Sequence, residues 1–180
     1  MKTNKALIEI TKTPLELAVE QTSDVVDCFC KGLKAVKKEH RSKIHAVDTR
    51  KLTGSLDIDT STAVNYPNDN RWDYAIEHNG VTYFLEFHPA ATSNVSEIIG
   101  KKIWLKWWLK NKAPLINALK PTTQSAFHWI ATGSVKILPN SKHHKQLALA
   151  GLLPKESIYF PLSQHEFAAS TSAPPKRKPS

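Results

Sequence analysis

The pair Asn79-Gly80 is the feature that most constrains how this chain can fold. It lies between two segments of alternating apolar residues, 71–78 and 81–88. Asn-Gly in this setting is typical of a two-residue β-hairpin turn. Such a turn fixes the strand register, because His78 must then face Val81 and every other pair follows by counting outward.

The predicted register places two acidic residues directly opposite each other. Asp73 faces Glu86 and Arg71 faces His88, and cross-strand partners share a face with Cβ atoms about 4.5–5.5 Å apart. Facing carboxylates repel unless a positive group lies between them, so this pair is the first candidate for a functional site. The other face is expected to be the core face; it carries Trp72, Tyr74, Ile76, Tyr83, Leu85 and Phe87.

Charge and composition bound the classes of protein to consider. The net charge of the 180-residue chain is +9, which favours an anionic partner, most often nucleic acid. A basic protein without such a partner is the alternative. The length suits one domain with a genuine core. The sequence contains no Gly-rich phosphate loop and no G-x-S-x-G motif, so the enzyme classes that depend on those motifs are not expected.

The two cysteines and the absence of long apolar segments indicate where the protein works. Cys28 and Cys30 are too few for a zinc site of the usual kind, and two small buried thiols are typical of a reducing cytoplasm. The N-terminal segment has no apolar run of the length expected for a signal peptide, and no stretch approaches about 20 uninterrupted apolar residues. We therefore expect a cytoplasmic protein that does not enter a membrane.

A first helix with one basic face is predicted after Ser23. Phe29, Leu33 and Val36 recur at helical spacing on its apolar side. A solvated surface is the plain alternative for the basic side, but like charges at this spacing cost stability, which favours a phosphate-binding role. The predicted nucleic-acid-binding residues on this side are Lys34, Lys37, Lys38 and Arg41.

A second, Trp-rich helix is predicted from Val95 to about Lys112. Apolar side chains cover roughly two-thirds of its circumference, so it should be mostly buried, against a sheet on one side and another helix or subunit on the other. A homodimer through this helix is therefore one expectation. Its narrow polar wedge holds Lys102, Lys106 and Lys110, of which Lys106 and Lys110 are predicted to bind nucleic acid.

The remaining segments complete the predicted order of elements. Thr13-Pro14-Leu15-Glu16 is typical of a helix start, 56–64 alternates like a strand after a break at 53–55, and 126–131 is typical of a buried strand. With the hairpin, the order is αβββαβ, which predicts an α/β (α+β) fold: one domain over residues 1–167 with a central mixed sheet flanked by helices. Residues 168–180 form a proline-rich, basic tail that is expected to be disordered.

The predicted chain has an acid on the second strand of a meander, Glu-Phe-His on the third strand, and a helix after it. This combination resembles the PD-(D/E)XK nuclease superfamily. The residues that carry the resemblance are Asp73 and Glu86-Phe87-His88, and it covers roughly residues 23–131. It implies that Asp73 and Glu86 hold a catalytic Mg²⁺ or Mn²⁺ and that the substrate is nucleic acid, DNA rather than RNA. Members often add an acid from the first helix, for which Glu39 is the candidate.

The sequence departs from the superfamily at two positions. Trp72 replaces a proline, which matters little, and His88 replaces the lysine that orients the attacking water. Related families supply that lysine from the following helix, where the candidates are Lys101, Lys102 and Lys106. We assign Lys102 as catalytic, and we assign His88 as a base or metal ligand because histidine titrates near neutral pH.

Two alternatives to a metal-dependent phosphodiesterase stay open. Arg71 could neutralise Glu86 across the diagonal with both acids facing solvent, which would make the hairpin merely amphipathic. The fold could instead be a degenerate nuclease that binds nucleic acid or protein without cleavage. The enzyme hypothesis requires that the carboxylates of Asp73 and Glu86 approach one common point.

Overall fold

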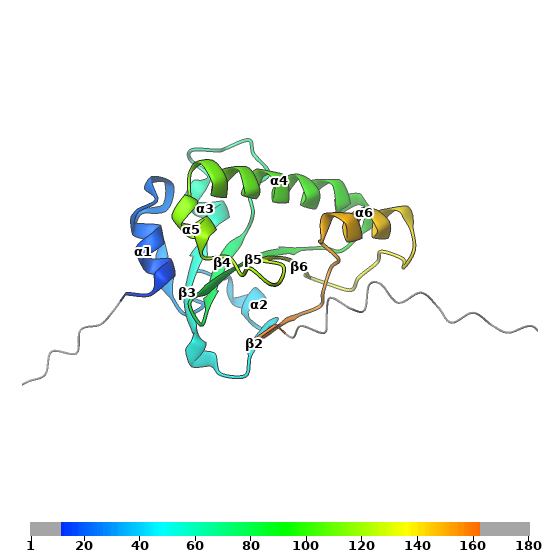
Figure 1. Cartoon of the computed structure of the whole chain (residues 1–180). Coiled ribbons are helices and arrows are strands. Elements are labelled where there is room, and N and C mark those ends of the chain that lie inside the picture. Colours follow the sequence, from blue (N-terminus) through cyan, green and yellow to red (C-terminus); the bar gives the residue numbers. More distant parts are fainter. Residues whose placement is uncertain (1–11, 163–180) are drawn as a thin grey trace, which may run out of the picture.

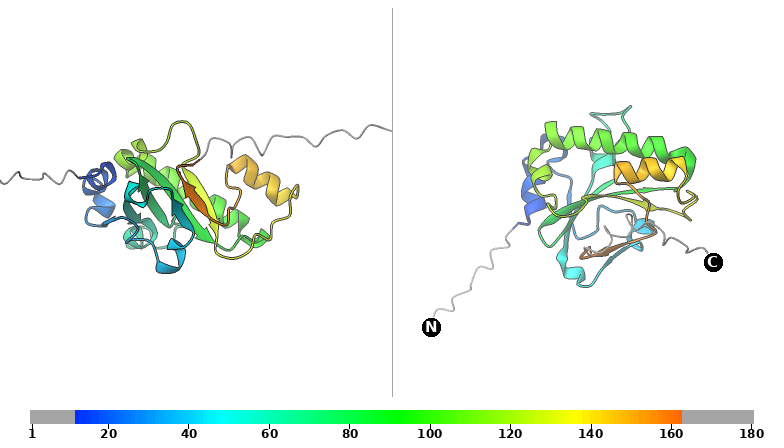
Figure 2. Two further views of the ribbon diagram at one scale, coloured as in Figure 1. Left: turned by 90° about the horizontal axis from the view of Figure 1, so that it is seen from below. Right: turned by 45° about the vertical axis from the view of Figure 1, so that its right-hand side comes forward.

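A computed structural model describes residues 12–162. A five-stranded sheet forms its centre, with a long helix across one face and a two-stranded sheet against the other (Figure 1). The views in Figure 2 show the long helix and a shorter helix together on one side of the central sheet. The predicted basic tail at 168–180 lies outside the described residues.

Helices and strands alternate along the described chain. The helices are α1 (Pro14–Glu20), α2 (Lys38–Arg41), α3 (Ile58–Thr62), α4 (Val95–Asn111), α5 (Pro114–Ala118) and α6 (Lys142–Ala150), with single 3-10 turns at η1 (Ser23–Val25), η2 (Thr49–Lys51) and η3 (Thr92–Asn94). The strands are β1 (Phe29–Lys31), β2 (Ile44–Ala46), β3 (Leu52–Asp57), β4 (Tyr74–His78), β5 (Val81–His88), β6 (Phe127–Ala131) and β7 (Ile158–Phe160).

The central sheet has the strand order β1-β3-β4-β5-β6. Strands β3, β4 and β5 form an antiparallel meander, and α4 then crosses over to β6, which runs parallel to β5. This confirms the predicted α/β fold with a central mixed sheet and the predicted succession of three meander strands, a helix and a further strand. Strand β1 and the helices α2 and α3 are not part of the predicted order. Strands β2 and β7 pair in parallel as the separate two-stranded sheet.

The hairpin between β4 and β5 forms in the predicted register. His78 pairs with Val81 and Tyr74 with Leu85. Asn79 and Gly80 both have positive φ, at 52° and 77°, which is the backbone conformation that a type I′ turn needs. The turn therefore sets the relative positions of Asp73 and Glu86, as expected from the sequence.

The prediction of a single core face on the hairpin is only partly correct, because both faces are buried. One face packs under β2 and β7, in a cluster that contains Tyr74, Ile76, Tyr83, Leu85, Phe87, Ile158 and Phe160. The other face packs under α4, in a cluster that contains Ala75, Phe84, Leu105 and Trp108. Trp72 belongs to the cluster under α4, since it precedes the first residue of β4 and does not follow the strand's alternation.

Helix α4 matches its predicted bounds, and it is less buried than the pattern indicates. Trp104 and Trp108 are buried in the core below the helix. Ile103 is 65% exposed and Trp107 is 44% exposed. One apolar face therefore packs on the sheet, while a second apolar strip stays on the surface.

The predicted basic helix after Ser23 is wrong. Phe29–Lys31 is instead strand β1, which pairs antiparallel with β3, and α2 is only four residues long. Gly32 has a φ of 61° and turns the chain between them. Helical spacing of apolar residues is a weak local preference, and pairing with a buried strand outweighs it.

The predicted strand over 56–64 is also wrong in its bounds. Strand β3 contains the expected break at 53–55 and ends at Asp57. The side chain of Asp57 accepts a hydrogen bond from the N–H of Thr60 (2.9 Å) and caps α3. An aspartate at the N-cap favours a helix at this point, so the alternating residues that follow turn into a helix instead of extending the strand.

No helix within residues 12–162 is both long enough and apolar enough to cross a membrane.

Candidate active site

Asp73 and Glu86 lie side by side at the end of the meander, and a backbone N–H holds each carboxylate. The N–H of Asp73 donates to Glu86 Oε2 (3.1 Å), and the N–H of Phe87 donates to Asp73 Oδ2 (2.8 Å). Each carboxylate is therefore fixed by an amide of the neighbouring strand. One oxygen of each, Asp73 Oδ1 and Glu86 Oε1, is left to contact other groups.

Those two oxygens face one cation, the ammonium group of Lys101. Lys101 Nζ lies 2.5 Å from Glu86 Oε1 and 3.7 Å from Asp73 Oδ1. The Glu86 side chain is 0% exposed, and those of Lys101 and Asp73 are 13% and 18% exposed. The two facing acids thus have a positive group between them, which relieves the repulsion expected from the sequence. Their carboxylates approach a common point.

The structure corrects the assignment of Lys102, because Lys101 is the lysine at the acid pair. Lys102 Nζ donates to the backbone oxygen of Ala150 at the end of α6 (2.6 Å) and lies 5.0 Å from the centre of the Phe127 ring. Adjacent residues of a helix point about 100° apart. Lys101 and Lys102 therefore contact different parts of the molecule, and sequence spacing alone did not distinguish them.

Burial makes this site unfavourable for uncompensated negative charge. Burial, and then the charge of Asp73, raise the pKa of Glu86 to about 8. Burial also raises the pKa of Asp73. For Lys101, burial lowers the pKa, but the charges of Glu86 and Asp73 outweigh it and the net shift is upward. Further positive charge near the carboxylates would lower both of their pKa values.

His88 lies at the border of the site, as expected. Its Nδ1 is 3.9 Å from Glu86 Oε1, and its Nε2 is 3.5 Å from Glu97 Oε2. Asn94 Nδ2 lies 3.1 Å from the same Nε2. The ring therefore connects Glu86 with the start of α4, and it is 22% exposed and accessible from solvent.

Arg71 does not neutralise Glu86, which removes one of the alternatives. Its Nε donates to Asp59 Oδ1 (2.9 Å) on α3. Asp59 is a neighbour of the acid pair that the sequence did not single out, and its charge contributes to the raised pKa of Asp73. Because Asp59 looked like part of a strand, nothing in the sequence placed it beside Asp73.

His40, and not Glu39, is the residue that α2 brings toward this end of the sheet. Its ring stacks on Phe87, with centroids 4.3 Å apart and planes 4° apart. The charge of Asp73 acts on the pKa of His40, which burial lowers overall. Glu39 is exposed on the same helix. Only the packing of α2 against the meander reveals His40.

The predicted nucleic-acid-binding residues lie on two separate elements and do not share one helical face. Lys34, Lys37, Lys38 and Arg41 are exposed in and before α2, and Lys106 and Lys110 are exposed on α4. Arg41 contacts its own loop, since its Nε donates to Val36 O (2.8 Å) and its Nη2 to Lys34 O (3.1 Å). Its guanidinium group therefore holds the loop before α2. Among the hydrogen bonds found for residues 12–162, none involves the ammonium groups of the five predicted lysines.

The donor set of the acid pair fits a hard divalent cation. Mg²⁺ commonly takes one or two carboxylates and completes its coordination with water and phosphate oxygens. Asp73 Oδ1 and Glu86 Oε1 face one point, which the ammonium group of Lys101 occupies in this structure. No group of three or more His, Cys, Asp or Glu within residues 12–162 could hold a metal ion. Asp73 and Glu86 are the residues that would hold an ion here.

Comparisons with protein-family models, with curated proteins and with solved structures returned no match.

Proposed function

We propose that the chain is a metal-dependent nucleic-acid phosphodiesterase of the PD-(D/E)XK type, with Asp73, Glu86 and Lys101 as catalytic residues. The observation that carries the proposal is the shared contact of Lys101 Nζ with Asp73 Oδ1 and Glu86 Oε1 at the end of the meander. An acid pair next to a lysine is the arrangement that the family resemblance implies, with the lysine supplied by α4 instead of by position 88.

Each residue of the site has a defined task in this proposal. Asp73 and Glu86 hold Mg²⁺ or Mn²⁺, which when bound acts as a Lewis acid and lowers the pKa of a coordinated water. Lys101 places its ammonium group beside the reacting phosphate and stabilises the negative charge that develops there. His88, next to Glu86, accepts a proton at Nδ1 or orients the water that loses it.

The charge of the molecule supports a polyanionic substrate, and we propose the cytoplasm as the place where the chain meets it. The net charge is +9, and lysines are exposed in and before α2 and on α4, the helix that also carries Lys101. Lysines that neutralise phosphates release counterions and provide binding without sequence preference. We propose DNA as the substrate, and RNA of the same sequence is the comparison that tests the choice.

Cleavage by the Glu86→Gln variant tests the proposal directly. The full chain is incubated with single- and double-stranded oligonucleotides in Mg²⁺, Mn²⁺ or EDTA, and the cleavage rate is measured on gels. We expect wild-type cleavage in either metal, none in EDTA, and a loss of about 100-fold or more in Glu86→Gln, as is typical when a charge-stabilising group is removed.

Glu39→Gln is the matched control, because it changes the same side chain at an exposed position away from Lys101. Its cleavage rate should remain within about twofold of wild type. Equal rates for wild type and Glu86→Gln would show that a contaminating nuclease is responsible, and the proposal would fail.

A non-catalytic binding module is the second candidate, and the surface of α4 favours it. Ile103 and Trp107 are exposed one turn apart, which suits a homodimer contact through α4. A wild-type chain that binds oligonucleotides but cleaves none would support this function. Light scattering of the wild type and of Trp107→Lys then measures the dimer, which the substitution should dissociate.

A further inference from the structure

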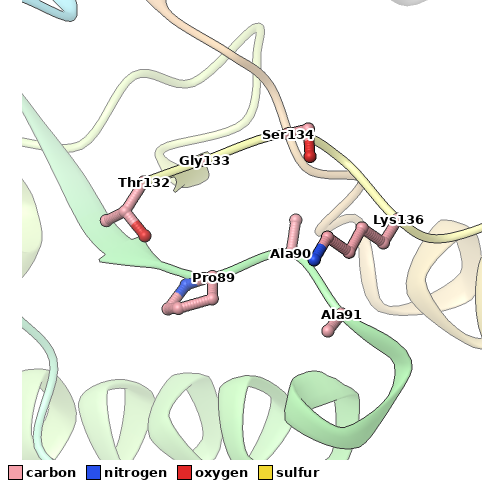
Figure 3. Close-up of a pocket in the computed structure, with 7 residues that line it drawn as sticks. All are labelled: Pro89, Ala90, Ala91, Thr132, Gly133, Ser134 and Lys136. Carbon is pink, nitrogen blue, oxygen red and sulfur yellow. The ribbon is translucent and has the colours of Figure 1, made fainter.

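A pocket opens at the C-terminal ends of β5 and β6, the edge of the central sheet near which Glu86 lies. It has a volume of about 320 Å³ and lies between two loops (Figure 3). Ligands commonly bind outside the carboxyl ends of parallel strands in α/β proteins. The lining residues are Pro89, Ala90 and Ala91 after β5, and Thr132, Gly133, Ser134 and Lys136 after β6.

Backbone hydrogen bonds fix the position of this pocket relative to the site. The N–H of Thr132 donates to His88 O (3.2 Å), and the N–H of Lys136 donates to Ala90 O (2.8 Å). The two walls are thus joined at both ends. The pocket begins directly after His88, which is two residues beyond Glu86 in β5.

The lining is suited to an anion that carries a flat or apolar group. Figure 3 shows the hydroxyls of Thr132 and Ser134 turned toward the space between the loops and the side chain of Lys136 reaching back toward Ala90. None of the seven lining residues is acidic. Hydroxyl and ammonium groups donate to phosphate oxygens, and Pro89 and Ala91 of the other wall add apolar surface.

We propose that this pocket holds one unpaired nucleotide of the substrate, with its phosphate against Lys136, Thr132 and Ser134. The inference rests on the proposed phosphodiesterase function, since it assigns the path of the strand away from Asp73 and Glu86. The volume is at the lower end of the range of about 300–1,000 Å³ for small-molecule sites. It therefore suits a single nucleotide, and the substrate class is single-stranded or locally unpaired nucleic acid.

Oligonucleotide binding to the full chain tests the pocket. The Glu86→Gln background prevents cleavage, and fluorescence anisotropy measures the Kd for one labelled DNA strand, alone and in duplex, over a range of salt concentrations. We expect an added Lys136→Ser change to weaken single-strand binding about fivefold and to reduce the salt slope by about one. Duplex binding should change less than twofold.

Lys112→Ser is the matched control in the same background. Lys112 is an exposed lysine directly after the far end of the 17-residue helix α4, and its removal should change single-strand binding less than twofold. Thr132→Val is a second pocket variant that keeps the side-chain shape and removes one hydroxyl, and it should weaken single-strand binding about threefold. Thermal unfolding shows that each variant is folded.

Four results would overturn the pocket proposal. In the first, Lys136→Ser and Lys112→Ser weaken single-strand binding equally; in the second, Lys136→Ser weakens single-strand and duplex binding equally. In the third, neither Lys136→Ser nor Thr132→Val changes binding. In the fourth, neither oligonucleotide binds to the chain. The two proposals can also fail separately. If the wild type cleaves nothing but Lys136→Ser still weakens single-strand binding, the pocket proposal is supported and the phosphodiesterase proposal is rejected.

Discussion

Two adjacent lysines, Lys101 and Lys102, provide the sharpest test at the scale of single residues. Lys101→Met should reduce the cleavage rate about 100-fold or more, because it removes the positive charge at the acid pair. Binding of an oligonucleotide should change only a few fold, since one exposed or half-buried charge among many contributes little. Cleavage rates and anisotropy measured on the same preparation check this prediction.

Lys102→Met is the internal control for that experiment. Lys102 Nζ contacts Ala150 O and is directed away from the acids, so its removal should leave the cleavage rate within about twofold. A larger loss of cleavage in Lys102→Met than in Lys101→Met would contradict the site as built from the structure.

The raised pKa of Glu86 predicts how stability depends on pH. The folded value of about 8 lies above the ordinary value of 4.5, so the folded state favours the protonated carboxyl. The stabilisation is fully present below about pH 4.5 and is lost as the pH rises through 8. Asp73 is shifted in the same direction. The free energy of unfolding in EDTA should therefore fall from pH 5 to pH 8.

Urea unfolding at a series of pH values measures this loss. Glu86→Gln cannot ionise at this position, so its free energy of unfolding should vary less between pH 5 and pH 8 than that of the wild type. Parallel pH profiles for the two proteins would show that Glu86 is not the titrating group.

At the scale of elements, the contact between β1 and β3 depends on one glycine. A Cβ at Gly54 would overlap the ring of Phe29 and lie 3.3 Å from Glu77 Oε2. Gly54→Ala should therefore destabilise the fold by about 1–3 kcal/mol, the usual cost of overpacking a core. At Gly133, a Cβ would meet nothing within 4 Å, so Gly133→Ala should change the free energy of unfolding by less than about 0.5 kcal/mol. Chemical denaturation of both variants provides the comparison.

The elements also show where local patterns predict correctly and where they do not. The capping box of Thr13 and Glu16 at α1 and the Asn-Gly turn are contained within a few residues, and both form as predicted. The helix predicted after Ser23 fails because Phe29 pairs with Leu56. That pairing joins residues far apart in the chain, and no short segment of sequence contains it.

At the scale of the whole molecule, the net charge of +9 predicts binding that depends strongly on salt. The logarithm of the association constant should fall linearly with the logarithm of salt concentration, with a slope near −0.9 for each phosphate contacted in duplex DNA. Glu86→Gln should keep this slope, because it removes no lysine. Titrations between 50 and 200 mM salt measure it, and binding that is independent of salt would argue against a phosphate-binding surface.

The sequence by itself determined the hairpin register, the opposition of Asp73 and Glu86, the α4 helix and the strand that follows it in a mixed sheet. These follow from turn chemistry and from periodic apolar residues, which act over short stretches of chain. The tertiary structure decided that Lys101 and not Lys102 faces the acids, that Arg71 pairs with Asp59, and that both faces of the hairpin are buried. The rotation of α4 over the sheet decides the first of these, and it depends on packing between distant side chains.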